Sequence, residues 1–173
     1  EVAKKVSLTE LGSIKINKEE RTKMLKTIPR SSIIGFLIGV LPGAGATIAS
    51  FLSYGMERNF VSDEEKEKFG KGSVHGLAAP ETANNAACSG AFVPLLTLGI
   101  PGSGTTAVML GALLGFGIQP GPRLYITNPE IFWSVIMSMY IGMVILLILN
   151  LPLIPYIARI LAVPKNYLIP LIL

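Results

Sequence analysis

The feature that most constrains this chain is a Pro-Gly turn in the middle of a long uncharged stretch. The segment Leu98-Gly-Ile-Pro-Gly-Ser-Gly-Thr-Thr106 lies inside residues 82–122, which carry no charged side chain. A helix that crosses a bilayer needs about 20 apolar residues, and Pro-Gly in its middle would leave polar backbone groups with no water to satisfy them. We therefore expect this break to be buried in protein or to serve a function.

A second break has the same design. Pro42-Gly-Ala-Gly-Ala-Thr47 matches Pro101-Gly-Ser-Gly-Thr-Thr106 at four of six positions, with small residues at the other two. A helix that restarts inside a membrane presents free N–H groups and about half a positive charge, which can bind an anion without a basic side chain. Small residues can also serve only to pack helices closely. The repeated order of residues favours a binding element, as found at paired half-helices of transporters.

Composition indicates a membrane protein without nucleic-acid partners. Half of the 173 residues are hydrophobic and only 15% are charged, which is unusual for a soluble domain of this length. Eight of the fifteen Lys and Arg residues precede Ser31, so the net charge of +4 marks a juxtamembrane segment next to a lipid bilayer. Cys88 is the only cysteine, which excludes an internal disulfide and a cysteine-based metal site within this chain.

The same composition argues against an enzyme. No Ser-His or paired-Asp arrangement lies within reach in the sequence, and Glu81 is the only acid between Glu67 and Glu130. The glycine-rich turns resemble nucleotide loops only superficially, because Thr105 stands where a phosphate loop carries lysine. We predict no cofactor and no firm metal site.

The sequence predicts an all-α integral membrane protein, with broken or re-entrant helices at the Pro-Gly turns and ordinary spanning helices. The expected segments, in order, are a basic juxtamembrane segment (1–30), a broken helix or re-entrant hairpin (31–56), a charged loop with a short helix (57–76), a second broken helix or hairpin (77–118), a loop (119–130), a transmembrane helix (131–158), and a loop with the start of a truncated next helix (159–173). The positive-inside rule would place residues 1–30 and 58–71 on the cytoplasmic side, which favours the hairpin for 31–56.

Local signals predict several helix ends. Asn17 followed by Glu20 is typical of a helix start, and Pro29 is expected to end that helix. Ser62 with Glu65 predicts a capping box. Pro80 suits a first helical position.

The candidate substrate- or ion-binding residues fall into three groups. They are the first turn (Pro42, Gly43, Gly45, Thr47), one face of the following helix (Glu81, Asn84, Asn85), and the second turn (Pro101, Gly102, Ser103, Gly104, Thr105, Thr106). Glycines allow a ligand to approach the backbone, and hydroxyl or amide oxygens could coordinate Na⁺ near Asn84, Asn85 and Thr106. The alternatives are dipole compensation for Glu81 and interhelical hydrogen bonding for the two asparagines. His75, beside a charged loop, is expected at the surface.

Several ordered motifs between Ser31 and Arg123 closely resemble the large membrane subunit of tripartite tricarboxylate transporters. They are Gly39-Val-Leu-Pro-Gly-Ala-Gly-Ala-Thr-Ile-Ala49 with Tyr54 and Glu57, Phe69-Gly-Lys-Gly72, Ala79-Pro-Glu-Thr-Ala-Asn-Asn-Ala86, Gly99-Ile-Pro-Gly102 and Gln119-Pro-Gly-Pro122. Two departures are His75, where the family pattern leads us to expect an acid before Gly76, and the polar, compact Ser103-Gly104 pair.

The resemblance implies uptake of a tri- or dicarboxylate such as citrate across the bacterial inner membrane, coupled to Na⁺ or H⁺. It also implies a multi-pass protein built from two related halves of an inverted repeat, with this chain in the second half. The implied partners are a small membrane subunit and a periplasmic solute-binding protein that delivers the substrate. A membrane scaffold that docks partners without transporting is the alternative.

Overall fold

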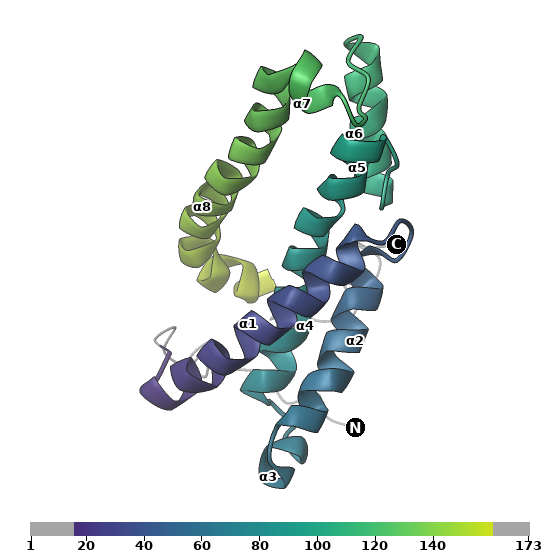
Figure 1. The fold of residues 1–173 in the computed structure, drawn as a ribbon. Helices are drawn as coiled ribbons and strands as arrows, with labels where there is room; N and C mark the ends of the chain where they lie inside the picture. The colour runs from purple at the N-terminus through teal and green to yellow at the C-terminus, as the bar shows by residue number, and fades with distance from the viewer. Residues whose placement is uncertain (1–15, 161–173) are drawn as a thin grey trace, which may run out of the picture. The chain divides into compact units, whose positions relative to one another are not determined.

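The structure is a computed structural model that describes residues 16–160, apart from the side chains of residues 155 and 157–160. All regular elements in this range are helices, which confirms the predicted all-α class for the described part (Figure 1). They are α1 (Lys18–Val40), α2 (Gly45–Phe60), α3 (Asp63–Lys66), α4 (Val74–Gly90), α5 (Phe92–Leu98), α6 (Gly104–Gly115), α7 (Leu124–Thr127) and α8 (Pro129–Ile160). Residues 16–132 form one compact unit, and most of α8 belongs to another.

Helices α1 and α2 form an antiparallel hairpin around the first Pro-Gly turn. The predicted start of α1 is confirmed, because the side chain of Asn17 accepts the N–H of Glu20 at 2.7 Å and the side chain of Glu20 accepts the N–H of Asn17 at 2.9 Å. The chain turns at residues 41–44, and Thr27 on α1 then faces Glu57 on α2. The chain therefore doubles back on itself at this turn.

The predicted end of the first helix at Pro29 is wrong. Helix α1 runs through Pro29 to Val40. A proline removes only one backbone hydrogen bond from the helix, here to the carbonyl of Leu25. Thr27 and Ser31, on either side of it, are buried against the other helices, so tertiary packing compensates for the lost bond.

Three helices pack along stripes of small residues that recur every fourth position. Figure 1 shows α1, α2 and α4 side by side. The buried positions with this spacing are Thr27, Ser31, Gly35 and Gly39 on α1, Ala49, Ser53 and Glu57 on α2, and His75, Ala79, Ala83 and Ala87 on α4. Gly90 is also buried, three residues after Ala87. A spacing of four keeps residues on one helical face, and small side chains let backbones approach.

The closest approach joins α1 to α4. A Cβ atom at Gly35 would overlap the backbone carbonyl of Ala83, and one at Gly39 would overlap that of Ala87. Close packing, the alternative we weighed for the Pro-Gly turns, thus operates within the helices. At Gly43, in the first turn, an added Cβ would meet nothing within 4 Å.

The predicted helix start at Pro80 is also wrong. Helix α4 begins at Val74, where the Ser73 hydroxyl caps it by accepting the N–H of Gly76 at 3.1 Å. Pro80 lies inside the helix. Hydroxyls of α2 support this region, since Ser53 donates to the carbonyl of Ala79 at 3.1 Å and Ser50 donates to that of Pro80 at 3.2 Å.

The capping box expected at Ser62 does not form. Ser62 occupies the N-cap of α3, but its side chain makes no capping hydrogen bond. The carboxylate of Glu65 instead pairs with Lys68 at 2.6 Å and with Lys23 of α1 at 3.2 Å. These ion pairs satisfy the carboxylate better than a neutral N–H would.

The second Pro-Gly turn separates α5 from α6. Helix α5 ends at Gly99 in the left-handed region, with φ 70°. A Cβ there would lie 2.8 Å from the carbonyl of Pro120, and Gly121 donates its N–H to Leu96 at 3.2 Å. The Gln119-Pro-Gly-Pro122 motif therefore packs on the end of α5. The segment expected as a loop at 119–130 also contains the short helix α7.

Helix α8 is long and apolar enough to cross a bilayer over Pro129–Ile154, which are 26 residues. This agrees with the transmembrane helix predicted at 131–158. Within the residues described, α8 alone is both long and apolar enough to cross a membrane, and α6 is a shorter apolar helix. The beginning of the basic segment (1–15) and the expected truncated helix at 167–173 lie outside the described residues.

Candidate functional site

The two Pro-Gly turns meet in space. The backbone N–H of Gly43 donates to the carbonyl of Gly102 at 3.3 Å. Gly102 is buried, and a Cβ there would lie 3.3 Å from the Cβ of Ala91 and 3.6 Å from the carbonyl of Gly39. Two breaks that are far apart in the sequence therefore form one local structure.

The first turn leaves the N-terminus of α2 uncapped by side chains. Gly43 and Gly45 have φ values of 82° and 69°, a region that other residues rarely adopt. Ala44 at the N-cap has no side-chain oxygen to offer, and Thr47 is exposed. The N–H groups of this first helical turn thus keep the partial positive charge of a free helix N-terminus. Pro42 is exposed beside them.

The second turn caps its own helix. The Ser103 hydroxyl accepts the N–H of Thr106 at 3.2 Å, and the Thr106 hydroxyl accepts the N–H of Ser103 at 2.8 Å. Thr106 is only 3% exposed, so these two hydroxyls serve the α6 cap. Gly104 and Thr105 are exposed, while Pro101 is half-buried.

The third predicted group lies apart from the turns. Glu81, Asn84 and Asn85 share one exposed face of α4, as their spacing predicts. Asn85 uses its side-chain amide to donate to the carbonyl of Glu81 at 2.9 Å. Among residues 16–160, no hydrogen bond links this face to either turn. Ala91 borders the second turn. Asn84 lies seven residues before Ala91, which is roughly 10 Å along a helix.

No hydrogen bond among the described residues joins Asn84 or Asn85 to Thr106, and the Na⁺ position suggested near these three residues stays a prediction. The Thr106 hydroxyl is buried in its cap, whereas Asn84 accepts a weak contact from the thiol of Cys88 at 3.9 Å. Oxygen ligands of one cation must converge within a few ångströms of each other.

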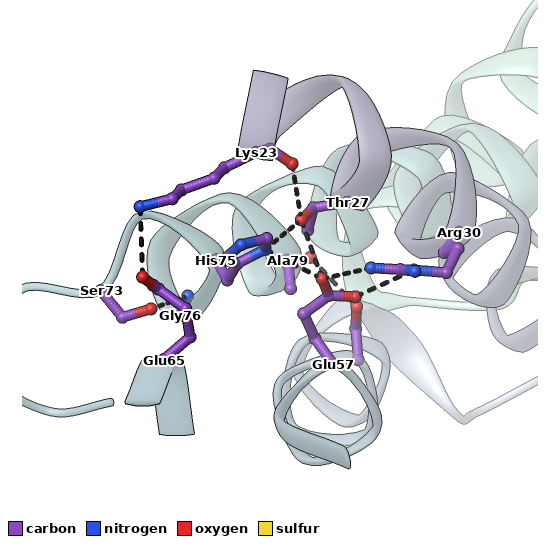
Figure 2. A network of polar contacts seen from close by, with 10 residues as sticks. Lys23, Thr27, Arg30, Glu57, Glu65, Ser73, His75, Gly76 and Ala79 are labelled. Carbon is purple, nitrogen blue, oxygen red and sulfur yellow. Dashed lines mark hydrogen bonds and ion pairs between the residues drawn. The ribbon is translucent and has the colours of Figure 1, made fainter. Parts of the chain in front are cut away.

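A buried polar cluster was missed by the sequence reasoning (Figure 2). The Thr27 hydroxyl lies 2.8 Å from Oε1 of Glu57 and 2.7 Å from Nδ1 of His75, and that Nδ1 lies 3.1 Å from the same Oε1. Arg30 donates to both carboxylate oxygens, at 2.6 and 3.2 Å. We call Thr27, Arg30, Glu57 and His75 the polar clasp, because it joins α1, α2 and α4.

The expectation of a surface His75 is therefore wrong, since the residue is only 7% exposed. Burial alone would raise the pKa of Glu57, but hydrogen bonds from Arg30 and Thr27 outweigh it and hold that pKa below its usual range. The guanidinium of Arg30 also lies 5.1 Å from the ring centre of Phe60. Residue spacing could have predicted the burial of these side chains. Thr27, Glu57 and His75 each lie four residues from a small buried residue on the same helix, namely Ser31, Ser53 and Ala79.

Comparisons with known proteins agree with this arrangement of motifs. No solved structure matches the chain. Two similar proteins come from Agrobacterium vitis. One is an uncharacterized 52.8 kDa protein in the TAR-I ttuC' 3' region, 41% identical over 98% of this chain and 33% of its own length. The other is an uncharacterized protein in the TAR-II ttuC' 3' region, 47% identical over 80% of this chain and 56% of its own length.

This chain thus spans between a third and about half of the curated relatives it matches. A family model described as the tripartite tricarboxylate transporter TctA family matches residues 1–173, the whole of the chain. The order of the motifs, the paired turns and the long apolar helix α8 are consistent with that match. The chain belongs to the tripartite tricarboxylate transporter TctA family.

Proposed function

We propose that this chain is part of a secondary transporter subunit that takes up a di- or tricarboxylate, such as citrate, across the bacterial inner membrane. The observation that carries the proposal is the hydrogen bond between Gly43 and Gly102. It brings two half-helix N-termini of similar sequence to one place. Membership of a transporter family favours transport over catalysis.

The electrostatics of the turns suit a carboxylate. A di- or trianion in a low-dielectric site is costly unless dipoles or cations offset its charge. Neither residues 31–56 nor residues 82–122 contain a Lys or Arg side chain. On this proposal, the uncapped first turn of α2 and the first turn of α6 supply the positive potential, and a coupling ion, Na⁺ or H⁺, supplies the rest.

The remaining parts of the proposal come from the family. A tripartite system implies a small membrane subunit and a periplasmic solute-binding protein, which would deliver the carboxylate to the turns. A multi-pass protein of two inverted halves would place a matching pair of turns in the part that lies beyond this chain. The Glu81, Asn84 and Asn85 face would then meet the substrate, the ion or the other half.

The hydroxyls of the two turns give the sharpest test. Thr47 and Thr105 are exposed beside the two helix N-termini, so Thr47→Val and Thr105→Val remove a donor and keep the shape. Thr22→Val is the matched control, because Thr22 is exposed on α1 and donates only to Lys18. We expect citrate uptake by the complete transporter to fall at least tenfold in the double variant and to stay unchanged in the control.

Two glycine variants and one asparagine variant complete the test. Gly43→Val, Gly102→Val and Asn85→Ala should each reduce uptake while the subunits still assemble, as shown by co-purification. Near-normal transport in all three would rule out the turns and the α4 face as the binding site. Assembly without any carboxylate binding in the wild-type protein would point to a scaffold.

A further inference from the structure

A polar pocket opens at the charged end of the α1–α2 hairpin. Its volume is about 470 Å³, which falls in the range of small-molecule sites, roughly 300–1,000 Å³. It lies between one side of α1, the end of α2 and α3, and its basic lining residues are Lys23, Lys26 and Arg30. Arg30 is the last charged residue before the uncharged stretch 31–56, and Glu57 is the first one after it. The pocket therefore lies where charged sequence meets apolar sequence.

One positive charge in this pocket has no carboxylate partner. Lys23 pairs with Glu19 at 2.7 Å and with Glu65 at 3.2 Å. Glu65 also pairs with Lys68 at 2.6 Å. Within residues 16–160, no ion pair or hydrogen bond engages the ammonium of Lys26, which is exposed. Lys26 thus brings to the pocket a full positive charge and N–H donors that are not in use.

Arg30 also keeps donors in reserve. It holds Glu57 through Nε and Nη2 (Figure 2), and no hydrogen bond in the described part of the chain uses its Nη1. Its side chain is 37% exposed. Lys26 lies four residues before Arg30 on α1, and like charges at this spacing repel each other. An anion bound between them replaces that repulsion with two attractions.

Apolar side chains continue from these two cations toward the Pro-Gly turn. On α1, Ile33 and Leu37 lie three and seven residues after the second cation and share its face. On α2, Met56 and Leu52 precede Phe60 in steps of four residues, and the ring of Phe60 lies 5.1 Å below the Arg30 guanidinium. All five apolar side chains are exposed. A small free anion leaves such a surface uncovered, whereas an amphipathic anion covers it.

We propose that this pocket binds the headgroup phosphate of an anionic phospholipid in the cytoplasmic leaflet, with the acyl chains along the apolar faces of α1 and α2. The positive-inside rule puts the basic end of the hairpin in the cytoplasm, and basic pockets between helices on that side bind anionic headgroups in other membrane proteins. A zwitterionic headgroup carries its own ammonium group, which Lys26 repels. The anionic class is therefore preferred.

The first experiment titrates lipid onto the purified full-length transporter in a neutral detergent at fixed, low ionic strength. A lipid that binds the folded protein raises its apparent Tm. Phosphatidylglycerol should raise the apparent Tm of the wild type, and phosphatidylethanolamine should not. In Lys26→Gln, the phosphatidylglycerol concentration that gives half of the rise should increase about fivefold. Lys71→Gln removes an exposed charge outside the pocket and should match the wild type.

Three results of this titration would overturn the proposal. Equal responses to the two lipids would show that the site does not select an anionic headgroup. An unchanged titration in Lys26→Gln, or an equal loss in Lys71→Gln, would show that the lipid binds elsewhere or responds to overall charge. No response in the wild type would show that another part of the transporter fills the pocket.

The second experiment separates a lipid from a free anion. Glycerophosphoglycerol carries the headgroup of phosphatidylglycerol without acyl chains, so it should need at least a tenfold higher concentration for the same rise in apparent Tm. Equal potency of the two compounds would replace the lipid site with a site for a soluble anion. Both titrations omit citrate, so a missing lipid response leaves the transport proposal intact, and a lack of citrate uptake leaves the lipid site intact.

Discussion

Glycines inside helices have very different roles in this structure. Gly39 and Gly55 both lie inside helices. A Cβ at Gly39 would overlap the backbone of Ala87, whereas one at Gly55 would meet nothing within 4 Å. The contrast shows that a glycine's cost or benefit depends on the neighbouring backbone.

We expect Gly39→Ala to destabilise the protein by about 1–3 kcal/mol, because α1 and α4 must separate to admit a methyl group. Gly55→Ala, the matched control, should be neutral or stabilising by up to about 1 kcal/mol, because alanine favours the helix. Apparent Tm of the full-length protein in detergent would measure both. Equal effects of the two substitutions would contradict the close packing.

The ion pair of the polar clasp predicts a dependence on acid pH. The pKa of Glu57 is held below its usual range: burial raises it, and the hydrogen bonds from Arg30 and Thr27 lower it further than burial raises it. A depressed carboxyl pKa contributes stability above its unfolded value, about 4.3, and this contribution is lost as the pH falls through the folded value.

Arg30→Met should therefore cost about 1–2 kcal/mol at neutral pH, a modest figure because the side chain of Arg30 is 37% exposed and partly screened by water. The difference from wild type should shrink as the pH falls through the lowered pKa of Glu57, below which Glu57 is protonated in both proteins. Arg58→Met, which removes an exposed neighbouring charge, is the control and should show little effect. Apparent Tm from pH 3 to 7 would measure this, and a constant difference would contradict it.

At the scale of elements, the two half-helices begin differently although their sequences match. Helix α6 is capped by reciprocal bonds between Ser103 and Thr106, and α2 begins at Ala44 without a side-chain cap. Ser103 aligns with Ala44, which has no hydroxyl. The backbone also differs, since it is helical at Ala44 and extended at Ser103, and the N–H of Ala44 donates to the carbonyl of Leu41 instead. The N-terminus of α2 is therefore the more open of the two.

Because capping hydroxyls contribute about 1 kcal/mol each, Ser103→Ala and Thr106→Val should each destabilise α6 by about that amount. The effects should not add, because either substitution breaks the same reciprocal pair. Hydrogen exchange of the α6 amides would report the loss. Fully additive effects would show that the two hydroxyls act independently.

At the scale of the whole molecule, the hairpin predicts a membrane topology. Helices α1 and α2 are antiparallel, so the basic residues from Lys18 to Arg30 and those from Arg58 to Lys71 lie at the same end of the hairpin. The positive-inside rule places that end in the cytoplasm.

Cysteines introduced at the exposed positions Arg21 and Asn59, with Cys88 replaced by serine, should both react with a membrane-impermeant thiol reagent from the cytoplasmic side. A cysteine at Asn128 would report on the start of α8. Reaction of Arg21 and Asn59 variants from opposite sides would contradict the hairpin. Uptake assays on each variant would show that the protein is intact.

Much of the local structure could be predicted from the sequence. The start of α1 at Asn17, the breaks at Pro42 and Pro101, and the apolar helix α8 all depend on interactions among neighbours in the chain. Proline, glycine, capping side chains and hydrophobic length act over a few residues, so they can be read directly. The shared face of Glu81, Asn84 and Asn85 follows from helical periodicity in the same way.

Tertiary structure decided what the local signals could not. Pro29 and Pro80 stay inside helices because packing outweighs the loss of one backbone bond each. His75 is buried because Thr27 and Glu57, 48 and 18 residues away, supply its partners. The contact between Gly43 and Gly102 depends on how three helices align their small residues. By itself the sequence determined where helices break, and only long-range packing decided that the two breaks meet.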